Sequence, residues 1–212
     1  MNPEALTAPL SPDERKDFQQ RFEKRLETVK AKTDDVFAFK KVDRQLCVVN
    51  SAFYWVFGLD TDTFPGDYFD NAAVMTHFQE RTYYDQIQEI EDDFVPYLMP
   101  WFGTGVTASA FGCRIVFPPK QDPAVDPRHY PVKTAEDVRK LEITDPEKDG
   151  LMPKVLDYLR YMKTHSFLPV GVTDFQGPLT TANRMKGWSS IPSIRLSWAC
   201  LAMANIPRSA AT

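Results

Sequence analysis

The stretch Val172–Gly187, VTDFQGPLTTANRMKG, decides the fold class that we predict for this chain. It follows a short apolar run, Leu168–Val172, which is typical of a strand buried on both faces. Asp174 and Gln176 then stand at the carboxyl end of that strand, and Gly177-Pro178 begins a predicted helix. A strand that passes directly into a helix is the repeating unit of a parallel sheet.

The same alternation is predicted upstream. A capping box with proline at the first helical position, Ser11–Glu14, begins a long helix with Phe18, Phe22, Leu26 and Val29 at helical spacing. Three more strands then alternate with helices. The predicted strands are Leu46–Val49, Asp93–Leu98 and Cys113–Phe117, and the predicted helices cover Asn71–Glu91, Val106–Phe111, a short segment capped by Thr134 and a segment capped by Asp149. The pattern predicts an α/β fold with a parallel sheet.

The predicted organisation has three parts. Residues 1–40 form an N-terminal helical extension, residues 41–187 form the α/β body, and residues 188–212 form an atypical C-terminal tail. The last 25 residues contain no Asp or Glu, although the chain of 212 residues has 29. They also lack helix caps and a consistent period, so we expect this tail to be poorly matched to the fold before it.

Composition narrows the class of partner and the compartment. The net charge is −4 and no basic tract is present, which argues against nucleic-acid and anionic-membrane partners. No apolar run reaches the ~18–20 residues that span a bilayer, and the first residues do not resemble a secretory signal. Cys47, Cys113 and Cys200 are widely spaced, which favours reduced thiols and a cytoplasmic location.

Four segments occur in an order that resembles a known family. They are Val42-Asp43-Arg44, Phe102–Gly105 followed by Ala108–Cys113, Glu142–Leu156, and Gly177–Thr180 followed by Gly187. Over about Arg21–Gly187 the chain resembles the uroporphyrinogen decarboxylase (URO-D) family, which includes corrinoid- and coenzyme M-dependent methyltransferases. The resemblance implies a (β/α)8 TIM barrel whose site lies at the carboxyl ends of the strands.

The resemblance also implies an incomplete barrel. A full barrel takes ~250 residues, whereas about four strands fit before Gly187. We therefore expect the N-terminal half of a barrel, truncated or with a replaced C-terminus. A half-barrel leaves apolar faces uncovered, so a homo-oligomer formed through them is expected.

The candidate site residues come from the strand ends of this proposed barrel. Asp174 is the predicted catalytic residue, with capping of the following helix as its alternative role. Gln176 and Tyr97 are predicted to bind substrate. Asn50 and Ser51 either bind substrate or satisfy the turn after the first strand. Arg184 either pairs with an anionic ligand or is a solvated helix residue.

The sequence leaves two classes of function open. The first is a URO-D-like enzyme, either a lyase of porphyrin metabolism or a cobamide-dependent methyltransferase, acting on a tetrapyrrole, a corrinoid or another small molecule. The family's decarboxylases carry an arginine-rich segment after the first strand, but Asn50–Trp55 has no arginine. No cofactor is identifiable in this chain; zinc or corrinoid is implied for a full-length methyltransferase relative. The second class is a fragment or interaction module without activity.

Other polar and aromatic groups have competing interpretations. Trp101 and Phe102 either wall a flat ligand or fill the core. The cluster Glu89–Asp93 either binds a divalent cation or is a solvated helix end. Cys113 is predicted to be inert packing. None of the three histidines, His77, His129 and His165, has metal-site spacing, and His165 suits the end of a helix.

Overall fold

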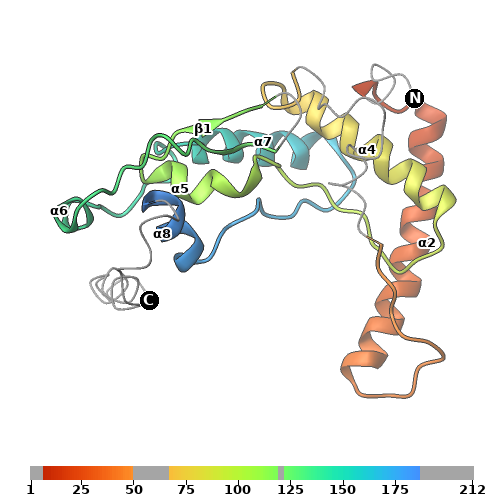
Figure 1. Ribbon diagram of the computed structural model, residues 1–212. Coiled ribbons are helices and arrows are strands. Elements are labelled where there is room, and N and C mark those ends of the chain that lie inside the picture. Colours follow the sequence, from red (N-terminus) through yellow and green to blue (C-terminus); the bar gives the residue numbers. More distant parts are fainter. Residues whose placement is uncertain (1–6, 50–66, 119–121, 187–212) are drawn as a thin grey trace. The chain divides into compact units, whose positions relative to one another are not determined.

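The computed structural model describes residues 7–49, 67–118 and 122–186. This part of the chain is rich in helix, and its one sheet has two strands (Figure 1). No helix in these ranges combines the length and apolar character needed to cross a membrane. The helices are α2 (Pro12–Phe37), α4 (Ala72–Glu89), the 3-10 helix η1 (Gly103–Gly105), α5 (Val106–Ala110), α6 (Ala135–Arg139), α7 (Met152–His165) and α8 (Pro178–Lys186).

The chain divides into two compact units, which we describe separately. Unit 1 comprises Met1–Pro100 and Tyr158–Gly171, and unit 2 comprises Trp101–Asp157 and Val172–Thr212. The helix α7 contributes residues to both units. The predicted tail, residues 188–212, lies outside the described residues.

Unit 1 is built on α2 and α4. The predicted capping box at the start of α2 is confirmed, because the Ser11 hydroxyl accepts from the Glu14 N–H and the Glu14 carboxylate accepts from the Ser11 N–H. Phe18 and Phe22 are the buried residues of this helix, and both stack edge-on against Phe167. These buried residues lie in the N-terminal half of α2, and the rest of the helix extends past α4 in Figure 1.

Extended segments of unit 1 lie side by side without forming a regular sheet. Leu98 and Val170 form an isolated parallel bridge, in which the Leu98 N–H donates to Pro169 at 2.9 Å and the Gly171 N–H donates to Leu98 at 2.7 Å. The Asp93 N–H donates to the Cys47 carbonyl at 2.7 Å. The predicted strands Leu46–Val49, Asp93–Leu98 and Leu168–Val172 are therefore linked by main-chain hydrogen bonds, but none forms a strand in the described residues, and Asp93 and Leu168 lie in bends.

Unit 2 contains the sheet, and it corrects one prediction. The segment Cys113–Phe117 does not join a parallel sheet: β1 (Ile115–Val116) pairs antiparallel with β2 (Ala124–Val125). The reason is the length of the connection. A parallel pair needs a crossover of about a dozen residues or more, whereas only residues 117–123 separate these strands. The segment that we expected to be a third parallel strand is half of a hairpin.

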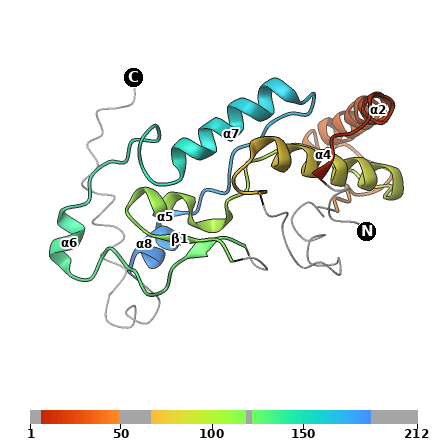
Figure 2. The ribbon, with the colours of Figure 1, turned by 90° about the horizontal axis from the view of Figure 1, so that it is seen from above.

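The short helices of unit 2 pack around this hairpin. Figures 1 and 2 both show α5 beside α8, and the two helices are in contact. The capping box predicted at Thr134 is confirmed at the start of α6. The core gathers apolar residues from several elements, namely Ala108, Cys113, Val125, Val132 and Met185, with Phe111, Ile115, Val138 and Leu141 packed against them.

The start of α7 differs from the sequence prediction. The Asp149 carboxylate accepts a hydrogen bond of 2.6 Å from the Asp145 N–H, so it closes the preceding turn. The Leu151 N–H instead donates to the Ser109 hydroxyl at 2.9 Å. A tertiary contact with α5 therefore satisfies a main-chain donor at the beginning of this helix.

Candidate functional site

The candidate site in unit 2 begins with Asp174. It is half-buried between buried Thr173 and exposed Phe175, four residues after the bridge residue Val170. The Gln176 Nε2 donates to the Asp174 Oδ1 at 2.9 Å. This bond fixes the orientation of the carboxylate, and the second carboxylate oxygen gives the pair a further acceptor for a ligand.

Arg184 lies on α8 and is held by Thr104. Its Nη2 donates to the Thr104 Oγ1 at 2.5 Å, and its carbonyl faces the Cys113 thiol at 3.7 Å. The next residue, Met185, is buried in the core of unit 2. The bond to Thr104 and the burial of Met185 hold the Arg184 side chain on unit 2. Thr104 was not among the predicted residues, and no local sequence signal links it to a residue 80 positions away.

The predicted site residues do not form one cluster in the described structure. No hydrogen bond or ion pair joins Asp174 or Gln176 to Arg184 in the part of the chain that the structure describes. Tyr97 belongs to unit 1, where its ring packs near Phe94, with centroids 6.0 Å apart, and against Gly171. Asn50 and Ser51 lie outside the described residues.

Apolar side chains flank Asp174. The exposed fractions are 70% for Val172, 55% for Phe175 and 61% for Leu179. These three exposed apolar side chains lie within eight residues of sequence. The immediate surroundings of the carboxylate are thus apolar as well as polar.

Trp101 and Phe102, the two aromatic residues before η1, both make contacts within unit 2. Phe102 is fully buried, with the Lys154 ammonium 5.6 Å from its ring centroid. The half-buried Trp101 donates from its indole Nε1 to the Asp122 carboxylate at 2.9 Å. Of the two interpretations given above, the core interpretation holds for Phe102.

A buried carboxylate that the sequence analysis did not identify organises the loop after β2. Asp126 is fully buried and accepts hydrogen bonds from the Arg128 guanidinium, the Arg128 N–H and the His129 Nδ1, at 3.0–3.1 Å. The Arg128 guanidinium is the main cause that holds the pKa of Asp126 far below its usual range. A carboxylate bonded to main-chain and side-chain donors two or three residues later is typical of an Asx turn, a local signal that the sequence did contain.

The acidic cluster Glu89–Asp93 divides into two parts: Glu89, the last residue of α4, and Glu91 are exposed, as expected for a solvated helix end, whereas Asp92 and Asp93 are buried. Asp92 and Asp93 are 7% and 4% exposed, so neither lies on a solvated helix end. Asp92 pairs with Arg25, and Asp93 pairs with Lys32 and Arg44. They also accept from the main-chain N–H groups of Val49 and Cys47. Because protein cations and N–H groups occupy these carboxylates, they hold the chain rather than a metal ion.

Two further predictions concern Cys113 and metal binding. Cys113 is buried, and burial raises the pKa of its thiol to about 11, which matches the predicted inert packing role. Among the described residues, no group of three or more His, Cys, Asp and Glu side chains is placed to hold a metal ion.

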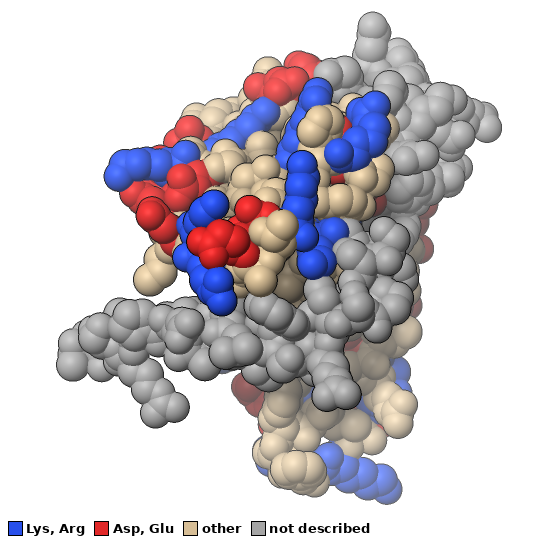
Figure 3. Space-filling model, turned by 60° about the vertical axis from the view of Figure 1, so that its left-hand side comes forward, with Lys and Arg blue, Asp and Glu red and all other residues tan. Residues whose placement is uncertain are grey.

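Charged groups on unit 2 are mixed in sign. Figure 3 shows Lys and Arg interspersed with Asp and Glu on one face, without a single-sign stripe. Neighbouring pairs explain the pattern, since Arg139 lies 3.0 Å from Glu136 and Lys148 lies 2.7 Å from Asp145. Exposed pairs of this kind contribute little to stability.

Comparison with known proteins adds no assignment: no family model matches the chain, and no curated protein and no solved structure matches it.

Proposed function

We propose that this chain is a URO-D-like protein built on the N-terminal half of a (β/α)8 barrel. The ordered sequence segments support this proposal, and so does the parallel bridge between Leu98 and Val170. In this interpretation the antiparallel hairpin β1–β2 stands where the strand Cys113–Phe117 was expected, so the proposal retains three of the four expected barrel strands. The extended segments near Cys47, Leu98 and Val170 then follow one another as neighbours, as consecutive strands of a barrel do.

The position of Asp174 carries the functional proposal. It follows the Leu168–Val172 segment, and barrels place their working groups after the carboxyl ends of strands. Gln176 orients the carboxylate at 2.9 Å. In a decarboxylase, Asp174 would stabilise a positively charged, protonated pyrrole intermediate. In a methyltransferase, it would orient the methyl acceptor. Substrate is a tetrapyrrole, a corrinoid or a related small molecule in both cases.

The test is a pair of assays on the purified chain. One supplies uroporphyrinogen and measures decarboxylated porphyrinogens; the other supplies a methylated corrinoid with a thiol and measures methyl transfer. We expect turnover in one assay and a loss of about 100-fold or more in Asp174→Asn, as for a residue that handles charge or protons. Asp34→Asn is the matched control, because Asp34 is exposed on α2. Turnover that survives Asp174→Asn would overturn the role of this residue.

A non-catalytic interaction module is the second candidate function. The exposed Val172, Phe175 and Leu179 favour it, because apolar surface around a carboxylate suits a protein partner as well as a substrate. Absence of turnover with both substrates, in a chain that unfolds cooperatively, would favour this function over the enzyme.

A further inference from the structure

We infer that the C-terminal end of α2 and the loop after it form a self-association surface, through which two copies of this chain dimerise. The surface, called here the α2 tip, comprises Val36–Val49. It belongs to unit 1 and is separate from the Asp174 site, so the inference does not depend on the proposed enzymatic function.

The first observation is the backbone of Phe39. Its φ is +54°, and it is the one non-glycine residue with positive φ among the described residues. The Phe39 N–H donates to Val36 and the Lys40 N–H donates to Asp35, at 3.0 and 2.9 Å. This pair of bonds is a Schellman motif, and Phe39 occupies the position that glycine usually takes. A side chain at this position strains the backbone.

The second observation is that the Phe39 side chain gains nothing within one copy. It is 97% exposed, and its neighbour Phe37 is 79% exposed. A strained position that holds a fully exposed aromatic ring is disfavoured twice in the monomer, by its backbone and by its contact with water. Burial of the ring against another molecule would supply the missing compensation.

The third observation is a complementary hollow on the same surface. An open groove of about 540 Å³ lies at the α2 tip, lined by Val36, Phe39, Lys40, Val42, Gln45 and Leu46. Phe39 therefore borders a groove of mixed polar and apolar lining. A two-fold axis presents the same surface to itself, so that the ring of each copy can enter the groove of the other.

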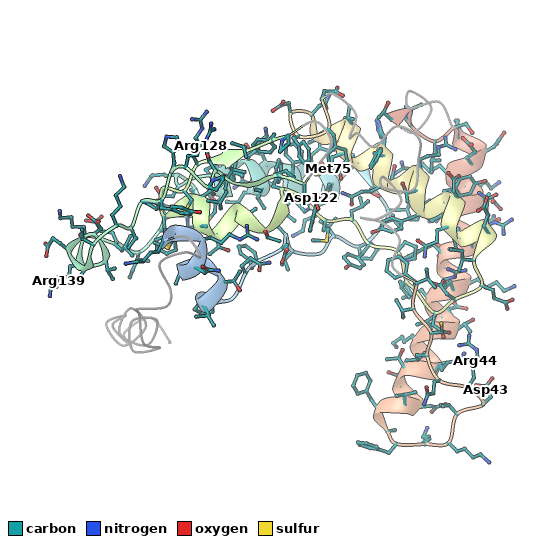
Figure 4. All side chains as sticks on the ribbon, viewed as in Figure 1. Asp43, Arg44, Met75, Asp122, Arg128 and Arg139 are labelled. Atoms are coloured by element: carbon teal, nitrogen blue, oxygen red, sulfur yellow. The ribbon has the colours of Figure 1, made fainter. Side chains whose placement is uncertain are left out.

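The charged residues around the α2 tip support a second copy of this chain as the molecule that binds there. Acidic Asp34 and Asp43 and basic Lys40 and Lys41 are all exposed around the apolar residues. Figure 4 places Asp43 next to Arg44 on the loop that follows α2. A surface that carries both signs at its margin is complementary to itself under a two-fold rotation, whereas a partner of one charge would meet repulsion on part of it. Two exposed phenylalanines and one open groove offer few contacts, so we expect the dimer to be weak.

Sedimentation of the full chain over a concentration series up to about 1 mM tests the inference, because a weak dimer is populated in that range. Wild type should change from monomer to dimer. Phe39→Gly should raise the dissociation constant by about 10-fold or more, while its melting temperature rises by about 2–4 °C as strain is relieved. Phe37→Ser, at a helical position, should weaken the dimer without the rise in melting temperature.

Ile143→Ala is the matched control, because it removes an exposed large apolar side chain of unit 2 that belongs to neither proposed surface and should leave the dissociation constant unchanged. A wild-type chain that stays monomeric throughout would overturn the inference and leave a different protein as the occupant. Equal self-association of wild type and Phe39→Gly would also overturn it. A lower melting temperature in Phe39→Gly would refute the argument from backbone strain.

Discussion

The side-chain amide of Gln79 forms two hydrogen bonds with the main chain of Met99. The Gln79 Nε2 donates to the Met99 carbonyl at 2.8 Å, and the Gln79 Oε1 accepts from the Met99 N–H at 3.0 Å. Gln79 lies on α4 and is 2% exposed. The main chain of a neighbouring strand would normally supply this donor and this acceptor. Here the Gln79 side chain supplies both, just after the bridge residue Leu98.

Replacing Gln79 by Leu should destabilise the chain by about 2–4 kcal/mol, because it leaves a buried N–H and a buried carbonyl of Met99 unpaired. Urea unfolding followed by circular dichroism measures the change. Gln88→Leu is the control on the same helix, since Gln88 is exposed. Equal free energies of unfolding for the two variants would contradict the role given to Gln79.

Gly150 should not tolerate a side chain. Its φ is +59°, and an added Cβ would lie 2.4 Å from the Ser109 carbonyl carbon. Gly150→Ala should therefore lower the free energy of unfolding by about 2 kcal/mol or more, from strain and a displaced α5. Gly177→Ala is the control, because an added Cβ there meets nothing within 4 Å. A neutral Gly150→Ala in thermal unfolding would refute the packing of this glycine on Ser109.

The Asp93 carboxylate should be needed to hold the loop after α2. It accepts from Arg44, Lys32 and the Cys47 N–H, and its side chain is 3% exposed. Asp93→Asn should cost about 2 kcal/mol, since Lys32 would lose its partner while Arg44 could turn toward water. Asp43→Asn, an exposed carboxylate of the same loop, should be nearly neutral in chemical unfolding. A loss shared by both variants would point to a general charge effect instead.

Glu14 should make stability depend on pH in the acid range. Hydrogen bonding from Arg81 is the main cause that lowers the pKa of Glu14 from 4.5 to about 2. A depressed pKa in the folded state stabilises the fold above the unfolded value, and this contribution is lost as pH falls from 4.5 toward 2. The difference in melting temperature between wild type and Glu14→Gln should therefore be largest near neutral pH and shrink across that interval.

Glu27→Gln provides the comparison for this pH series, because Glu27 is an exposed carboxylate of the same helix. Its melting temperature should follow wild type at every pH. A Glu14→Gln difference that stays constant from neutral pH to pH 2 would show that the Arg81 ion pair does not set the acid sensitivity.

Local signals in the sequence predicted the helices well. The capping boxes at Ser11 and Thr134 specify their own helix starts, because donor and acceptor lie three residues apart. The strand predictions were weaker. A short apolar run such as Leu46–Val49 or Cys113–Phe117 predicts a buried strand, but Val48, Val49 and Phe117 are exposed. Such a run also does not specify which segment will be its neighbour. The antiparallel pairing of β1 with β2 follows from loop length, which the sequence also contained.

By itself, the sequence determined the starts of α2 and α6, the burial of Phe18 and Phe22 and the placement of Asp174 after an apolar segment. Only the tertiary structure decided that Asp92 and Asp93 are buried against Arg25, Lys32 and Arg44, that Thr104 holds Arg184, and that Phe39 stands exposed in a strained conformation. The physical reason is the separation along the chain over which each kind of interaction acts. Caps and periodicity act over three or four residues, whereas ion pairs and burial depend on partners brought together from distant parts of the chain.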